Sequence, residues 1–124
     1  MTVELANILL ILGRALLGGL FVYGGIGHFF ALDPISAVIA ARGVPMPRLV
    51  LIVGSLFQIA LGLLLVLGIA VPLAAAGLIV FTVVASIIML DFWNKAEPER
   101  LGLRNAFLSN IAIIGGLLVA AGAA

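Results

Sequence analysis

Three polar side chains stand inside long apolar stretches of the sequence, where a hydrogen-bonding group needs a partner. Arg14 occupies the first apolar stretch, Gln58 the second and Asn110 the last. Polar groups within membrane-crossing helices usually face the interior of the bundle. At a rise of about 1.5 Å per residue, all three lie near the middle of their helices. We therefore expect one polar layer in which the side-chain oxygens of Gln58 and Asn110 accept hydrogen bonds from Arg14.

This expected layer supports two hypotheses. In the first, it is a polar clamp that fixes the packing of the helices. In the second, the buried guanidinium faces an anionic or quinone-like ligand in a central pocket. No carboxylate lies at the depth of Arg14, since Glu4 is near one end of its helix and Asp91 is at the opposite side of the bundle. An unpaired buried cation is costly, so the ligand hypothesis stays open.

A second group of side chains is expected at the other end of the helices. It comprises Tyr23, His28, Asp33, Asp91 and Trp93. His28 is the single histidine, so a bis-histidine haem or a multi-histidine metal site is excluded within one chain. It can pair with Asp91 or Asp33, and it then either holds a helix end or exchanges protons with a bound quinol. Cysteine is absent, which excludes disulfides and thiolate sites, and we predict no metal site and no catalytic residue.

The composition indicates the elements that must position these residues. Hydrophobic residues make up 65% of the 124 residues and charged residues only 9%, unlike a soluble domain. The net charge of +1 and the lack of a basic cluster exclude nucleic-acid binding. A helix needs about 20 apolar residues to cross a bilayer. We predict a single all-α domain over residues 1–124, an up-down-up-down transmembrane four-helix bundle with helices over about 5–30, 48–67, 72–92 and 103–121.

The loops predict further structure and an orientation. Asp33 is suited to cap a short helix with Pro34 in its first position, and this helix is expected to lie along the membrane interface. Lys and Arg gather in the first and third loops. The positive-inside rule then places those loops in the cytoplasm and both termini in the periplasm, with Trp93 as an interfacial anchor.

Taken in order, several short segments resemble the DoxX family over nearly the whole chain. They are Leu12-Gly13-Arg14, Phe21 to His28, Arg42-Gly43-Val44-Pro45, Gly62 to Gly68, Asp91-Phe92-Trp93 and Asn110 to Gly116. The resemblance implies a four-helix protein of the bacterial inner membrane. Some relatives are subunits of a thiosulfate:quinone oxidoreductase, and others associate with thiol and oxidative-stress systems. The chain departs from the family at Gln58, where members often carry glutamate, and at His28, where they often carry lysine.

The leading hypothesis is a membrane subunit that provides a quinone site or an anchor for a thiol- or sulfur-linked oxidoreductase. The chain carries no cofactor motif, so a partner would supply the redox centre, and the expected ligand is a bound quinone or lipid. Membrane lipid, other membrane subunits or further copies of the chain are the expected partners. The alternatives are a non-catalytic scaffold subunit and a small anion transporter in which Arg14 lines the pathway.

Overall fold

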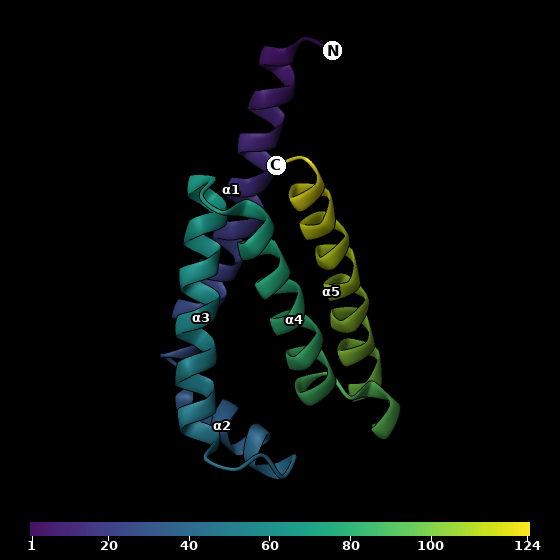
Figure 1. The fold of residues 1–124 in the computed structure, drawn as a ribbon. Coiled ribbons are helices and arrows are strands. Elements are labelled where there is room, and N and C mark those ends of the chain that lie inside the picture. Colours follow the sequence, from purple (N-terminus) through teal and green to yellow (C-terminus); the bar gives the residue numbers. More distant parts are fainter.

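The computed structural model describes all of residues 1–124, and every regular element in it is helical. Figure 1 shows the chain as a set of long helices with one short helix at one end. The elements are α1 (Val3–His28), α2 (Leu32–Ala41), α3 (Pro47–Leu67), α4 (Val71–Met89), the short 3₁₀ helix η1 (Phe92–Asn94) and α5 (Glu99–Gly122).

The four long helices confirm the predicted all-α four-helix fold. Each is long and apolar enough to cross a bilayer. Only 18 of the 124 residues are buried, and most of the large apolar side chains on the long helices face outward. Such a surface suits lipid, because acyl chains solvate leucine and valine as well as a protein core does. The last helix begins at Glu99, earlier than the expected 103, because part of the charged loop is helical.

The helices form two arms that diverge from a closed end. In Figure 1, α1 and α3 make one arm, α4 and α5 make the other, and α2 lies at the open end. The turn between α3 and α4 contains Gly68 and Ala70, both with positive φ, and Pro72 lies in the first turn of α4 as predicted. The closed end holds the apolar core of Phe21, Leu65, Val71, Ala75, Leu78, Leu117 and Ala120.

A contact between two glycines sets how α1 lies against α3. A Cβ atom added at Gly18 would lie 2.5 Å from the carbonyl oxygen of Gly62, and one added at Gly62 would lie 2.9 Å from the carbonyl oxygen of Gly18. Only glycine allows backbones to approach this closely. Further along, Gly25 leaves room for the side chain of Ile59, whose Cγ1 would lie 2.6 Å from an added Cβ atom.

This register leaves the start of α1 outside the bundle. Figure 1 shows the N-terminal turns of α1 reaching past the α3–α4 turn and past the C-terminus of α5. Arg14 lies at the level of that turn, since a Cβ added at Gly68 would lie 3.0 Å from its Nη2 atom. α3 has 21 residues, a length of about 31 Å that matches the hydrocarbon core of a bilayer. On that frame Arg14 lies near one membrane face and not at the midplane.

The short helix in the first loop is present but begins differently from the prediction. α2 starts at Leu32, its N-cap residue Ala31 makes no side-chain hydrogen bond, and Asp33 is therefore not a cap. The Asp33 carboxylate instead accepts a hydrogen bond from Arg48 at 2.6 Å. Ile39 of α2 is buried, so this helix packs against the inside of the bundle as well as closing its end.

The Gly18–Gly62 contact predicts the effect of adding a single methyl group. Gly18→Ala should lower the stability of the protein in detergent by about 1–3 kcal/mol, because neither backbone can yield without separating α1 from α3. Gly19→Ala is the matched control, since its Cβ would meet nothing within 4 Å. Thermal or denaturant unfolding followed by circular dichroism measures both. Equal stability of the two variants would contradict the close contact.

Candidate functional site

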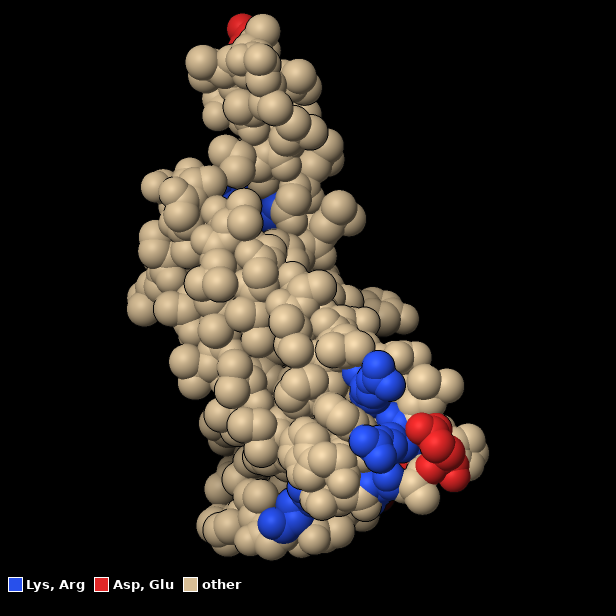
Figure 2. All heavy atoms as spheres, turned by 90° about the vertical axis from the view of Figure 1, so that its right-hand side faces the viewer, with Lys and Arg blue, Asp and Glu red and all other residues tan.

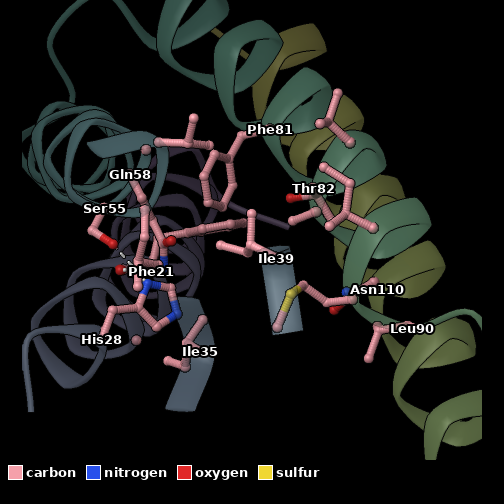
Figure 3. A pocket seen from close by; sticks show the side chains of 18 of the residues that line it. Phe21, His28, Ile35, Ile39, Ser55, Gln58, Phe81, Thr82, Leu90 and Asn110 are labelled. Atoms are coloured by element: carbon pink, nitrogen blue, oxygen red, sulfur yellow. Dashed lines mark hydrogen bonds between the residues drawn. The ribbon is translucent and has the colours of Figure 1, made fainter. Parts of the chain in front are cut away.

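A cavity lies between the two arms towards the open end of the bundle. Its volume is about 560 Å³, and 13 of its 20 lining residues are hydrophobic. Figure 3 shows side chains entering it from every long helix and from α2. Pockets for small ligands in proteins commonly have about 300–1,000 Å³ and a mostly apolar lining with a few fixed polar groups. The cavity has these properties.

One wall of the cavity carries a polar corner made by α1 and α3. His28 Nδ1 and Ser55 Oγ are 2.9 Å apart, and the Gln58 amide nitrogen donates to the carbonyl oxygen of Phe21 at 2.9 Å. Ser55 and Gln58 are three residues apart on α3, so they share one face of that helix. The Ser55 hydroxyl holds the imidazole by Nδ1, which leaves Nε2 as the ring nitrogen with no partner inside the protein.

The Gln58 side chain is the most unusual member of this corner. It is only 5% exposed, and its carbonyl oxygen Oε1 has no hydrogen-bond partner. Most buried polar atoms in folded proteins have a partner, so an orphan acceptor at a cavity needs an explanation. Space beside the amide is kept by Gly24, where a Cβ atom would lie 3.1 Å from Gln58 Nε2.

The opposite wall also has polar groups, and each of them makes one hydrogen bond within the protein. Thr82 donates its hydroxyl proton to the carbonyl oxygen of Leu78 at 2.7 Å, one turn back on α4. The Asn110 amide nitrogen on α5 donates to Ser86 Oγ at 2.9 Å and so joins α4 to α5. Both Thr82 and Asn110 line the cavity.

An ion pair ties α2 to the end of α4 beneath the cavity. Arg42 Nη1 and Asp91 Oδ2 are 2.5 Å apart, and Asp91 is nearly fully buried. Ile39, three residues before Arg42, and Leu90, directly before Asp91, both line the cavity. Figure 2 shows that most of the visible Lys, Arg, Asp and Glu side chains gather at this end of the molecule, with one small blue patch further up and red atoms at the far tip.

The structure brings three of the seven predicted site residues to one cavity: His28, Gln58 and Asn110. The expected polar layer with Arg14 is wrong. Arg14 makes no hydrogen bond to Gln58 or Asn110, its Nε is buried without a partner, and its guanidinium lies against Gly68 at the C-terminus of α3. The last carbonyl groups of a helix carry partial negative charge, which favours a cation there.

The expected second cluster is separated into individual interactions. Tyr23 is 81% exposed and points away from the bundle. His28 bonds to Ser55, so its expected pairing with Asp33 or Asp91 is wrong, because each carboxylate is taken by an arginine. Trp93 packs edge-on against Phe92 and Phe107 at the charged end and does not line the cavity.

Sequence reasoning did not identify Ser55 as part of the site. Its signal was its spacing of three from Gln58, which places both on one helical face. Thr82 was not identified either; its hydroxyl bonds to its own helix, yet the residue lines the cavity. The apolar contributions of α2, Ile35 and Ile39, had no sequence signal because the path of the first loop decides them.

The fold and surface define a class of protein: a small integral membrane protein built as a four-helix bundle with an apolar cavity between its two arms. The profile of the DoxX family matches residues 9–91, which include most of α1 and all of α2, α3 and α4, and the chain belongs to this family. No curated protein and no solved structure matches it. Asn110 and the rest of α5 lie outside the matched range.

The two ion pairs at the charged end should differ in how much they stabilise the fold. Asp91→Asn should destabilise the protein by about 2–4 kcal/mol, because it leaves the partly buried Arg42 without its partner. Asp33→Asn removes the pair of an aspartate side chain that is 90% exposed and should cost below about 1 kcal/mol. Unfolding midpoints of both variants in the same detergent test this order. A larger loss for Asp33→Asn would refute it.

Proposed function

We propose that this protein is a quinone-binding membrane subunit that holds the head group of a lipid quinone in the cavity between its two arms. The observation that carries the proposal is the combination of an apolar cavity of about 560 Å³ with one polar corner formed by His28, Ser55 and Gln58. A quinone head is a flat apolar ring with two opposed oxygen atoms, and its tail is a hydrocarbon. The polar corner suits a ring oxygen of the head group, and the apolar lining suits the ring and the tail.

The residues of the corner have distinct roles in this proposal. Ser55 fixes the imidazole of His28 at Nδ1, and Nε2 is free to meet a ring oxygen of the ligand. Gln58, held by the carbonyl oxygen of Phe21, offers its own unpaired oxygen beside it. The apolar lining of α4 and α2 accommodates the ring and the start of the tail. A bound quinone supplies two-electron, two-proton redox chemistry.

In this proposal a partner subunit supplies the redox centre. This chain has no cysteine, and no group of three metal-binding side chains comes together in its fold. A partner subunit of a thiol- or sulfur-linked oxidoreductase would deliver the electrons, and this chain would place the acceptor and join the complex to the bilayer. The alternative of an anion pathway gains no support, since the cavity is lined by residues other than Arg14.

We extend the proposal to location and orientation. The membrane is the bacterial inner membrane, with the end that carries Arg42, Arg48, Lys95, Arg100 and Arg104 in the cytoplasm. Figure 1 places both termini at the opposite end, which is then periplasmic. Trp93 lies 47% exposed at the charged end, where an aromatic ring suits the interface.

Quinone binding should depend on His28 and not on Tyr23 or Arg14. Titration of the purified protein with a decyl-tailed benzoquinone should give a Kd at least about tenfold higher for His28→Phe, because a ring-oxygen hydrogen bond is lost. Tyr23→Phe is the matched control, since Tyr23 points away from the cavity. Arg14→Gln should also retain binding. Loss of binding in Arg14→Gln with retention in His28→Phe would locate the ligand elsewhere.

The orientation can be measured by labelling because the native chain has no cysteine. Lys95→Cys should react with a membrane-impermeant maleimide only after the inner membrane is opened. Thr2→Cys should react in intact spheroplasts, because it lies at the opposite end of the molecule. The reverse pattern would show that the charged loops face the periplasm.

A further inference from the structure

The Gln58 side chain in the polar corner restricts which chemical form of the ligand can bind. The direction of the Gln58 amide is settled by its neighbour, because the carbonyl oxygen of Phe21 is an acceptor and only the NH₂ group of Gln58 can face it. Oε1 is therefore the atom left over, buried and without a donor. An amide oxygen only accepts hydrogen bonds, so a ligand can satisfy it only by bringing a hydroxyl or N–H group.

His28 does not impose the same restriction. When the Ser55 hydroxyl donates to Nδ1, Nε2 carries the proton and donates to a ligand oxygen. When Nδ1 carries the proton and donates to Ser55, Nε2 accepts from a ligand hydroxyl. The His28–Ser55 pair can thus meet either a carbonyl or a hydroxyl group. The group that can discriminate between the two is Gln58 Oε1, the buried acceptor without a donor.

We propose that the cavity selects the reduced, hydroxyl-bearing quinol over the oxidised quinone, with Gln58 Oε1 as the selecting atom. A quinol offers a hydroxyl proton to Oε1, whereas a quinone presents a carbonyl oxygen to it, and two acceptors repel. On the other wall the Thr82 hydroxyl donates to Leu78 and one Asn110 N–H donates to Ser86, so neither of these donors is directed at a ligand. The inference rests on the proposed quinone-binding function and specifies its ligand.

The expected preference is at least about tenfold in Kd, the usual effect of one hydrogen bond to a desolvated acceptor. Tighter binding of the quinol raises the midpoint potential of the bound couple, by about 30 mV for each tenfold difference. The site would therefore favour reduction of a quinone held in it and retain the product.

Anaerobic titration of the purified full-length protein with a decyl-tailed benzoquinone, and with the same compound reduced to its quinol, tests the inference. The wild type should bind the quinol at least about tenfold more tightly. In Gln58→Met the preference should vanish, because the quinol loses its hydrogen-bond acceptor and the quinone no longer meets a repelling oxygen. Thr82→Val is the matched control, since it removes a cavity hydroxyl that already has a partner, and it should keep the preference.

Gln58→Glu guards against a variant that fails to fold. Its neutral carboxylic acid keeps a donor for the carbonyl oxygen of Phe21 and an acceptor for the ligand, so it should retain the preference for quinol. Equal Kd values for the two forms in the wild type, or a preference that survives in Gln58→Met, would overturn the selection while leaving quinone binding intact. Binding of neither form would overturn the proposed function itself and the selection with it.

Discussion

The structure depends on the place where the backbones of α1 and α3 touch. At Gly18 and Gly62 no side chain separates the two helices, so this contact sets their relative position along the axis. Every contact of α1 follows from that register. Arg14 reaches the end of α3, Phe21 reaches Gln58, and His28 reaches Ser55. A shift by one turn would bring different residues together at the corner.

The cavity exists because the two arms are joined tightly at one end only. The packed core near the α3–α4 turn holds Leu65, Leu78 and Leu117 without exposure, and from there the arms diverge. In water such an opening would collapse, but in a bilayer lipid or a lipid-like ligand can fill it. α2 and the Arg42–Asp91 pair close the end that faces the charged surface. The lining of the cavity is mostly apolar, while the corner formed by His28, Ser55 and Gln58 is polar.

Much of the fold follows from composition, and less of the site does. Four crossings could be predicted because each requires a run of about 20 apolar residues, and a helix of that length satisfies its own backbone groups in lipid. His28, Gln58 and Asn110 could be identified as candidates because a polar side chain on a membrane-spanning helix usually faces the interior of the bundle. Their joint presence on one cavity also required the register of α1 and the path of α2, which are tertiary properties.

Arg14 shows why counting along a helix is an incomplete measure of depth. The count assumed that α1 begins at the membrane face, whereas its first turns extend past the rest of the bundle. The partners of Asp33 and Asp91 were missed for a related reason. Arg48 and Arg42 are close to them only after the first loop folds back as α2. Sequence separation gave no means to choose between these arginines and His28.

Photoaffinity labelling tests the central claim most directly, because it reports where a quinone lies and not only that it binds. A tailed azidoquinone should attach within residues 20–28 of α1 and 50–58 of α3, and excess unlabelled quinol should prevent the attachment. Labelling confined to the outward faces of the helices, or labelling that quinol does not compete, would contradict a quinone site in the cavity.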